Sequence, residues 1–461
     1  MMKKILKILV VIILLGAFCA GGYYLYKKNN GNINVQGILP GGCVVDKLPS
    51  QKPGKFFKDF KNPFAALFKK KEKKHPLVFW TIQLKAPAGR FIEENIEVFK
   101  KMNPGVEIVW VDIPIAEAQK RTLASVLSGH PPDLINLNPD FSSLLAQKGI
   151  LEYFSEDEMK DFHPELVDKL RYNGKIFAMP FYATSPVTIY NEKTLNSCFN
   201  GDYPVVTSYE DIYGMAGEIK NCTDKAAIVL NLNENDTFAK ILNKYDISAF
   251  NTDAESKALR HVVSMFDNMY KKGYLPKDTL TLNHREMVEQ YMAKNAVFLV
   301  AGSNFIKMIK ENAPDIYKDS GITNQLTSPD GRYDVGLMNF VIPKNAKNKE
   351  LAKEFAMLLT NKENQLQFAK LTNTLPANLE VLLDDYFIEC PDDLIEKSRC
   401  IGASQLNFLT KQDFGYKNKK AINDTLNRTL EEILLNNKIG EEKLELKLKK
   451  LQNEIRNLKK D

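Results

Sequence analysis

Polar residues follow two apolar runs in the first third of the chain, and their types could bind a ligand. Thr81, Gln83 and Lys85 come at the end of the first run, and Asn138 and Asp140 come directly after a later one. Hydroxyl, amide, ammonium and carboxylate groups together donate and accept hydrogen bonds. Such a set can bind a ligand through hydrogen bonds.

A second polar group lies in the segment 172–191, which we interpret as a passage between two lobes. Its prolines, Pro180 and Pro186, cannot donate to a sheet ladder and force the residues before them to be extended. The residues between them are therefore predicted to form an extended crossing rather than a buried strand. Tyr182 and Thr184 lie on this crossing, so we expect them to face a cleft.

The elements that must position these residues alternate between strand and helix. Apolar runs and amphipathic spacing give the order β-α-β-α-β, which favours a mainly parallel sheet with helices on its faces. Ligands collect at the carboxyl ends of strands in such sheets, where the first polar group stands. The predicted elements are strand 77–83, helix 90–102, strand 106–113, helix 115–128 and strand 134–137.

The rest of the body continues the alternation. The segment 334–343 begins near a glycine and ends at a proline, so we interpret it as the return crossing. The last helix, 441–458, has leucines at alternating spacings, which is typical of a helix packed on its own lobe or of a short coiled coil. Further helices are predicted at 209–220, 253–272, 286–294, 349–359, 362–371 and 421–435, and further strands at 226–230 and 296–301.

The sequence contains few features that are typical of an enzyme. The five histidines stand at no triad or metal-ligand spacing, and the chain has no GxSxG, phosphate-loop or HExxH motif. We therefore expect a protein that is not an enzyme and that holds neither a metal nor a cofactor.

Four of the six cysteines form two near pairs, Cys198 with Cys222 and Cys390 with Cys400. Outside the cytoplasm such pairs are expected to be disulfides, each worth about 2–4 kcal/mol. Four free, half-buried thiols are the alternative.

The charge is unevenly spread along the chain. The first 74 residues hold 15 lysines and three acidic residues, whereas the remainder holds 48 basic and 54 acidic side chains. A mildly acidic body argues against nucleic acid as a partner, because phosphate binding needs a basic face.

The N-terminal arm predicts export. Residues 1–28 include an uncharged run, 8–26, that can just cross a bilayer as a helix, which favours a membrane anchor. A cleaved signal peptide and a lipid-modified Cys19 are the alternatives. Residues 29–75 are interpreted as a flexible basic tether. The body is therefore expected outside the cytoplasm, in the periplasm or at the cell surface, and tethered to the cytoplasmic membrane.

Four segments of the body together resemble one known family. Their order, over roughly 77–458, is similar to that in extracellular solute-binding proteins of ABC importers, in the family that includes maltose- and glycerol-phosphate-binding proteins. The segments are FIEENIEVFKKMNPGVEIVWVDI, SGHPPDLINLNPDFSSLLAQKGILEYF, YNGKIFAMPFYATSPVTIYNEKTL and MNFVIPKNAKNKELAKEFAMLLTNKENQLQFAKLTNTLPA.

The resemblance implies a two-lobed α/β fold of the periplasmic-binding-protein type II class. Each lobe would be a mainly parallel sheet flanked by helices, and a hinge would join the two. The N-lobe would comprise 76–181 and 340–385, and the C-lobe 184–336 and 386–461.

The resemblance also implies ligand contacts, although the chain departs from the pattern at one of them. Asn304 takes the position where sugar binders commonly place a tryptophan, and the only tryptophans, Trp80 and Trp110, fall in predicted strands. Ser303, beside Asn304, and Asn339, in the return crossing, complete the candidates. The full set is Thr81, Gln83, Lys85, Asn138, Asp140, Tyr182, Thr184, Ser303, Asn304 and Asn339.

Other side chains could replace the missing tryptophan or bind a charged group. Tyr182, Phe141 or Phe408 could stack on a sugar ring. Arg399 could clamp a phosphate or carboxylate, or could simply be a surface arginine.

The function implied is that of the substrate-binding component of an ABC transporter. The protein, expected to be a monomer, would capture a small solute such as a carbohydrate by lobe closure and deliver it to permease subunits. The alternative is a membrane-anchored surface sensor or scaffold that keeps the two-lobed fold without transport.

Overall fold

The computed structural model describes residues 75–234, 236–248, 250–329, 331–410, 418–436 and 439–460. All of them belong to one compact unit, Glu72–Asp461. The expected anchor, 1–28, and the tether up to residue 74 lie outside the described residues. Within the described part, no helix has the length and apolar character needed to cross a membrane.

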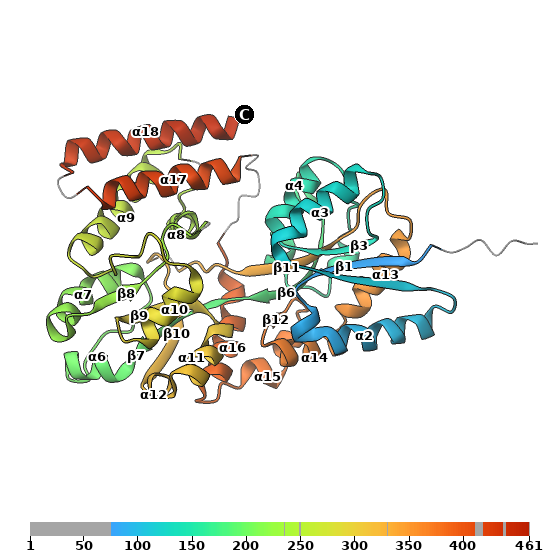
Figure 1. Ribbon diagram of the computed structural model, residues 1–461, viewed down its shortest axis with the longest axis horizontal. Coiled ribbons are helices and arrows are strands. Elements are labelled where there is room, and N and C mark those ends of the chain that lie inside the picture. The colour runs from blue at the N-terminus through green and yellow to red at the C-terminus, as the bar shows by residue number, and fades with distance from the viewer. Residues whose placement is uncertain are drawn as a thin grey trace, which may run out of the picture. The chain divides into compact units, whose positions relative to one another are not determined.

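The first sheet has six strands in the order β12-β6-β11-β3-β1-β2, and we call it, with its helices, the N-lobe (Figure 1). Aromatic rings fill its core, with ring centroids 4.4 Å apart for Phe181 and Phe340 and 5.3 Å apart for Phe79 and Phe355. Such pairs add about 0.5–1.5 kcal/mol each beyond their burial. The strands are β1 (Leu77–Ile82), β2 (Ile108–Ile113), β3 (Leu134–Leu137), β6 (Met179–Thr184), β11 (Gly336–Val341) and β12 (Leu375–Pro376).

Helices pack on both faces of this sheet and bury their apolar stripes against it. The hairpin of β4 (Arg171–Tyr172) and β5 (Lys175–Ile176) stands apart as a two-stranded sheet. The N-lobe helices are α2 (Lys85–Met102), α3 (Ile115–Leu127), α4 (Pro139–Gln147), α5 (Pro164–Asp168), α13 (Lys349–Leu359) and α14 (Lys362–Thr372), with short turns η2 (Asp157–Met159) and η3 (Val381–Leu383).

The second sheet has the order β10-β7-β9-β8, and we call it, with its helices, the C-lobe. Its strands are β7 (Pro186–Asn191), β8 (Ala226–Val229), β9 (Ala296–Gly302) and β10 (Ser320–Asn324). Its helices are α6 (Glu192–Phe199), α7 (Tyr209–Thr223), α8 (Thr237–Lys244), α9 (Asp253–Lys271), α10 (His284–Met292), α11 (Ser303–Asn312), α12 (Pro314–Lys318), α17 (Lys419–Leu434) and α18 (Glu441–Lys460).

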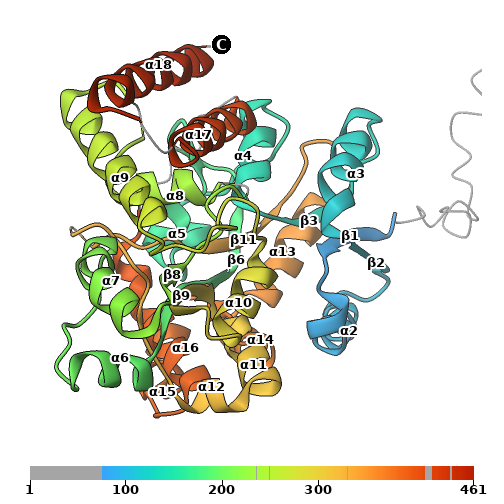
Figure 2. The same cartoon turned by 60° about the vertical axis from the view of Figure 1, so that its left-hand side comes forward.

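Local sequence signals start several of these helices. Reciprocal capping boxes begin α7, α9 and α10, where Ser208, Thr252 and Asn283 are the N-cap residues. The last helix, α18, lies with α17 beside α9 (Figure 2). Its Leu448 and Ile455 are buried in the C-lobe core, so the helix packs on its own lobe.

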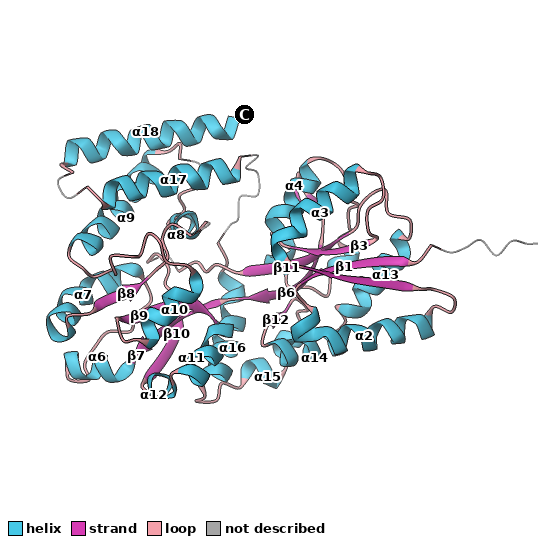
Figure 3. Cartoon of the chain, in the orientation of Figure 1, coloured by secondary structure: helices cyan, strands magenta, loops and turns pink. Residues whose placement is uncertain are grey.

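The chain passes between the sheets at two strand ends. Only Ser185 separates β6 from β7, and the return runs from the end of β10 to the start of β11. Figure 3 shows β6 and β11 side by side where they extend toward the C-lobe. The segment from α15 (Asp385–Ile388) through α16 (Leu394–Gln405) to η4 (Leu406–Phe408) also contacts elements of both sheets.

The first crossing differs from its prediction. The residues between its prolines do not form an isolated extended segment, because β6 is a buried strand that pairs with β11 and β12. Pro180 pairs with Asn339 at a register shift in the ladder between Met338 and Asn339. This irregularity accommodates a residue that has no N–H to donate.

The sheets are also mixed rather than mainly parallel. Among the described strands, two of the five pairings in the N-lobe sheet are parallel, β1 with β2 and β1 with β3. In the C-lobe sheet, one of three is parallel, β8 with β9. The cause is the hinge, since β6 leaves the N-lobe and its neighbour β11 returns to it in the opposite direction.

One of the two expected disulfides is present. Cys198 in α6 is bonded to Cys222 in α7, with the two Cα atoms 5.7 Å apart. Cys390 and Cys400 carry free thiols, so the second expected disulfide is not formed in this structure. Each of these thiols donates to a nearby backbone carbonyl instead, Cys400 to Glu389 and Cys390 to Ile388.

Candidate functional site

The loop after β1 carries three of the candidate residues and is held by a carboxylate. The Thr81 hydroxyl, fully buried, donates to Asp112 Oδ1 at 2.6 Å and accepts from Trp110 Nε1 at 2.9 Å. The Asp112 carboxylate also accepts from the backbone N–H of Lys85 at 3.0 Å. Thr81 therefore positions this loop from inside the lobe, whereas the side chains of Gln83 and Lys85 are exposed. The sequence reasoning missed Asp112.

The two candidate residues after β3 have different roles: one caps a helix and the other forms an ion pair. Asn138 is the N-cap of α4 and accepts from the backbone N–H of Phe141 at 2.9 Å. Asp140, in the first turn of α4, forms an ion pair with Lys419 Nζ at 2.6 Å. Lys419 is the first residue of α17, so this pair joins the N-lobe to the C-lobe. Lys419 also lies 3.3 Å from Asp236, the N-cap residue of α8.

Beside this ion pair lies a recess, which we call the interlobe recess. Its wall combines one N-lobe lysine, the residues that precede β11, and the helices α8 and α17 of the C-lobe. Polar groups line one part, and apolar side chains line another. The polar lining residues are Lys169, Asp236, Lys240, Asn243, Ser248, Asp334, Thr410, Lys419 and Asn423, and the larger apolar ones are Ile247, Phe250, Val335, Ile422 and Leu426.

Lys169, directly after α5, is the buried cation of this recess. Its side chain and backbone are only 6% exposed, and its ammonium group donates to the carbonyl oxygen of Thr410 at 2.6 Å. Burial lowers the pKa of Lys169 to about 8, against the opposing effect of the Asp334 and Glu165 carboxylates.

In the ion pair of Asp236 and Lys240, the neighbouring charges outweigh the effect of burial, in contrast to Lys169. Asp236 and Lys240 lie 3.0 Å apart, one turn from each other on α8. Burial opposes ionisation of Asp236, but the Lys240 and Lys419 cations hold its pKa below the usual value. The Lys240 side chain is half-exposed, and the partial burial of its ammonium group acts against the cation. The Asp236 and Asp334 carboxylates overcome this effect, so the pKa of Lys240 is raised. Both groups are therefore charged at neutral pH.

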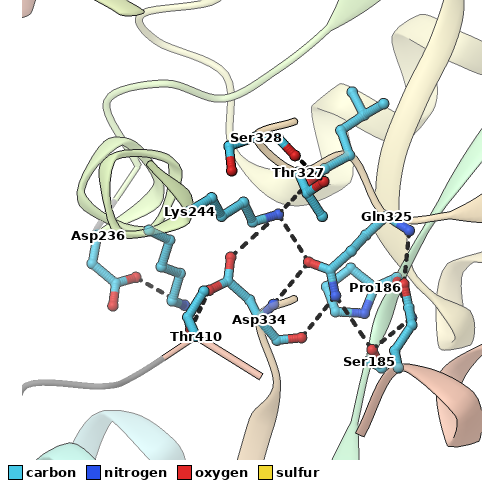
Figure 4. Close-up of polar contacts among 12 residues, drawn as sticks. Ser185, Pro186, Asp236, Lys244, Gln325, Thr327, Ser328, Asp334 and Thr410 are labelled. Carbon is cyan, nitrogen blue, oxygen red and sulfur yellow. Dashed lines mark hydrogen bonds and ion pairs between the residues drawn. The ribbon is translucent and has the colours of Figure 1, made fainter. Parts of the chain in front are cut away.

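A second polar network lies at the hinge itself (Figure 4). Lys244, at the end of α8, donates to Gln325 Oε1 at 2.9 Å and to the carbonyl of Leu326 at 2.6 Å. Its Nζ is also 3.4 Å from Asp334 Oδ2. The lysine thus connects both ends of the return segment between β10 and β11.

The same network reaches the first crossing. Gln405 Nε2 donates to Ser185 Oγ at 2.8 Å and to the carbonyl of Pro186 at 3.0 Å, while its Oε1 accepts from the backbone N–H of Gln325 at 2.8 Å. Both crossings and the end of α16 are therefore bonded to one another.

The remaining candidate residues are dispersed. Tyr182 is half-buried, and burial, reinforced by the Asp112 carboxylate, raises its pKa to about 12, so its hydroxyl keeps its proton at neutral pH. Thr184 lies opposite Gly336, and a Cβ at Gly336 would come within 2.5 Å of Thr184 Oγ1. A side chain at position 336 would therefore require Thr184 to shift.

Two predicted positions lie on the C-lobe and one lies inside the N-lobe. Ser303 and Asn304 form the first turn of α11. Asn339 is fully buried in the N-lobe sheet, where its side-chain N–H donates to Ser142 Oγ at 2.8 Å. Asn339 therefore supports the sheet and does not face a ligand in this structure.

Of the ten sequence candidates, none is among the described residues that line the interlobe recess, and Asp140 borders it through Lys419. The missed residues that do line it include Lys169, Asp236, Asp334 and Lys419. Asp236 follows the C-lobe strand β8. A search for polar residues after the strands of the second sheet, like that made for the first sheet, could have found it. Lysines in ordinary polar stretches carry no comparable signal.

The candidate stacking and clamping groups have other roles in the structure. Phe141 is buried in the N-lobe core, whereas Phe408 is exposed. The guanidinium of Arg399 lies 3.6 Å over the ring of Tyr386, and its Nε donates to the carbonyl of the same residue. It is thus a packed arginine rather than an open clamp. Within the described residues no group of three or more metal-ligating side chains is present.

Comparison with known proteins agrees with this architecture. Residues 94–392 match the family described as bacterial extracellular solute-binding protein. A protein of Brucella abortus (strain 2308), named as a candidate binding protein, is 24% identical over 325 residues, covering 67% of this chain and 77% of the relative.

Two solved structures have a similar fold. A candidate oligosaccharide periplasmic-binding protein from Synechococcus sp. MITs9220 is 24% identical with a TM-score of 0.70, covering 83% of this chain and 99% of that one. The sugar-binding protein MalE from Xanthomonas citri is 18% identical with a TM-score of 0.69, covering 84% and 98%.

Two α/β lobes, a bonded hinge and a polar recess between the lobes define a two-lobed binding protein. The chain belongs to the bacterial extracellular solute-binding protein family. Both the family resemblance and the two-lobed fold class drawn from the four sequence segments are thereby confirmed.

Proposed function

We propose that this chain is the substrate-binding component of an ABC transporter. It captures a hydroxyl-rich solute, a sugar, an oligosaccharide or a sugar or polyol phosphate, outside the cytoplasm and delivers it to permease subunits. The expected N-terminal segment tethers it to the cytoplasmic membrane, it acts as a monomer, and it is not an enzyme. The names of its two structural neighbours, one an oligosaccharide-binding and one a sugar-binding protein, support this class of ligand.

The observation that carries the proposal is a polar recess whose wall comes from both lobes. Asp140 of the N-lobe meets Lys419 of the C-lobe, so the two lobes already share one polar contact at its edge. A concave wall that combines a few polar groups with apolar side chains is typical of small-molecule sites.

Binding and closure are coupled in this proposal. A ligand that bonds to both walls makes all of its contacts only when the lobes are closed, so it shifts the population toward the closed state. A permease can then distinguish the loaded protein from the empty one by its shape. Gln83, Lys85, Thr184, Ser303 and Asn304, dispersed over the two lobes in this structure, are proposed to contact the ligand after closure.

Asp140→Ala tests the site. The full chain is first screened by thermal shift against neutral sugars, polyols, uronates and sugar phosphates, and the best ligand is taken to calorimetry. We expect the Asp140 variant to bind this ligand at least about tenfold more weakly, because it loses an acceptor for a ligand hydroxyl and the partner that holds Lys419 at the edge of the recess. Its melting temperature should stay close to that of the parent, since the Asp140 ion pair is about one-third exposed.

Asp157→Ala, an exposed carboxylate in η2 of the same lobe, is the matched control and should bind like the parent. Equal affinities in the two variants would remove Asp140 from the site. A screen without any thermal shift would contradict ligand capture and favour the sensor or scaffold function.

A further inference from the structure

Ammonium groups outnumber the carboxylates paired with them at the interlobe recess and its edge, among the residues that the structure describes. The ammonium groups belong to Lys169, Lys240, Lys244 and Lys419, and the paired carboxylates to Asp140, Asp236 and Asp334. One of these four ammonium groups therefore has no carboxylate within ion-pair distance.

Three of the lysines have carboxylate partners. Lys240 is 3.0 Å from Asp236, Lys244 is 3.4 Å from Asp334, and Lys419 is 2.6 Å from Asp140. Each pair places an ammonium group against its own carboxylate.

Lys169 is the cation that remains. Within 75–234 and the other described ranges, its ammonium group makes one hydrogen bond, to the neutral carbonyl oxygen of Thr410, although an ammonium group has three N–H donors. Among the described residues, no carboxylate lies within 4.0 Å of its Nζ. Charges as deeply buried as this one are normally paired, and Lys169 has no such counter-ion in the part of the chain that the structure describes.

We propose that the ligand of the interlobe recess carries an acidic group, a carboxylate or a phosphate on a sugar or polyol, and that Lys169 is its counter-ion. This inference rests on the proposed function and narrows its ligand class. Lys419, about one-third exposed at the edge of the recess, is paired with Asp140 and Asp236 and can donate a further N–H to the same ligand. The apolar side chains of Phe250, Ile422 and Leu426 offer a surface for the C–H face of the sugar ring.

The carboxylates near Lys169 do not prevent anion binding. Asp334 is already neutralised by Lys244, and one of its oxygens accepts from the Thr410 hydroxyl at 3.4 Å. Glu165, the other carboxylate that acts on Lys169, is exposed on α5 and is screened by water.

Matched pairs of acidic and neutral ligands test this inference on the full chain. Glucuronate is compared with glucose, galacturonate with galactose, glucose 6-phosphate with glucose, and glycerol 3-phosphate with glycerol, by calorimetry at pH 7 and low salt. We expect the acidic members to bind at least about tenfold tighter, as for a desolvated charge-assisted contact. The uronate and phosphate pairs distinguish the two kinds of acid.

Lys169→Met should abolish the preference for the acidic members. Lys277→Met, at an exposed lysine remote from the recess, is the control and should keep it. Far-UV circular dichroism and melting temperature confirm that each variant is folded, so a loss of preference is not a loss of structure.

The dependence of ligand affinity on pH distinguishes a ligand-binding lysine from a structural one, because a structural lysine would not change it. The pKa of Lys169 in the folded protein is about 8, so above this pH the side chain is mostly neutral. It must then take up a proton before it can pair with an anion. We expect the affinity for a uronate to fall about tenfold between pH 7 and pH 9 in the parent and to stay flat in Lys169→Met. A carboxylate ligand does not itself titrate in this range.

The outcomes separate the two proposals. Neutral sugars that bind as tightly as their acidic partners, or an acid preference that survives in Lys169→Met, would overturn this inference and leave sugar binding intact. If neither class binds, the proposed function fails as well.

Discussion

The hinge and the interlobe recess each contain a buried lysine, and the two lysines differ in the number of acceptors around their ammonium groups. Lys244 at the hinge is 4% exposed and Lys169 in the recess is 6% exposed, and burial lowers the pKa of both. Lys244 has three acceptors, Gln325, Leu326 and Asp334. Lys169 has one acceptor among the described residues, the carbonyl of Thr410.

The difference separates a structural charge from a charge that is held ready for a ligand. A buried ammonium with two close oxygen acceptors and a nearby carboxylate recovers much of its lost hydration, so it fixes the geometry of the hinge. A buried ammonium with one acceptor recovers less of its lost hydration, so its burial lowers the free energy of unfolding. Proteins tolerate such local costs at functional sites, where activity rather than stability is maintained.

Lys244→Met is expected to have the largest effect on stability. It leaves the Asp334 carboxylate, Gln325 Oε1 and the Leu326 carbonyl without their shared cation. We expect the free energy of unfolding to fall by about 3–5 kcal/mol, as when one partner of a buried ion pair is removed. Urea unfolding monitored by circular dichroism measures this.

Lys240→Met is the matched control, because Lys240 lies one turn earlier on α8 and its side chain is 49% exposed. We expect a change below about 1 kcal/mol there. Similar losses in both variants would mean that the hinge network contributes no more than a surface ion pair.

Lys169→Met is expected to move stability in the other direction. The variant removes an incompletely paired charge and keeps the apolar volume, at the cost of one hydrogen bond to Thr410. We expect the free energy of unfolding at pH 7 to rise by about 1–2 kcal/mol. A loss comparable to that in Lys244→Met would show that Lys169 is structural and that the two regions are alike.

The pH dependence sharpens the same comparison. The folded pKa of Lys169 is about 8 and the ordinary lysine value is 10.5, so between these values the unfolded chain binds more protons than the folded one. Stability from this residue therefore rises as pH increases from about 8 to about 10.5. We expect this rise in the parent, measured by urea unfolding at intervals of pH, and its absence in Lys169→Met.

Local patterns were sufficient for most of the framework. The strand 134–137 is observed at the predicted residues, and the helix predicted at 115–128 spans Ile115–Leu127. These elements depend on apolar periodicity within one segment, which the sequence displays directly. The prolines of β6 were misleading, because the ladder irregularity that accommodates Pro180 is provided by a strand more than 150 residues away.

The site was less accessible to prediction, because its residues are brought together by tertiary contacts. Lys169 and Lys419 stand in polar stretches that also contain solvated lysines, and nothing nearby in sequence distinguishes a buried one. Thr81 was predicted at a correct strand end, but its side chain turns inward to Asp112. A strand-end rule gives the region of a site, whereas the face of each side chain depends on the strand register.

The smallest effect on stability is expected at the contact between the two lobes. Lys419 and Asp140 are 34% and 39% exposed, so their ion pair is screened by water although it is 2.6 Å long. We expect Lys419→Ala to change the free energy of unfolding by less than about 1 kcal/mol. The same variant should weaken binding of an acidic ligand, since Lys419 borders the recess. Urea unfolding and calorimetry on one preparation measure both effects, and a loss of several kcal/mol in stability would mean that this pair belongs with the hinge rather than with the recess.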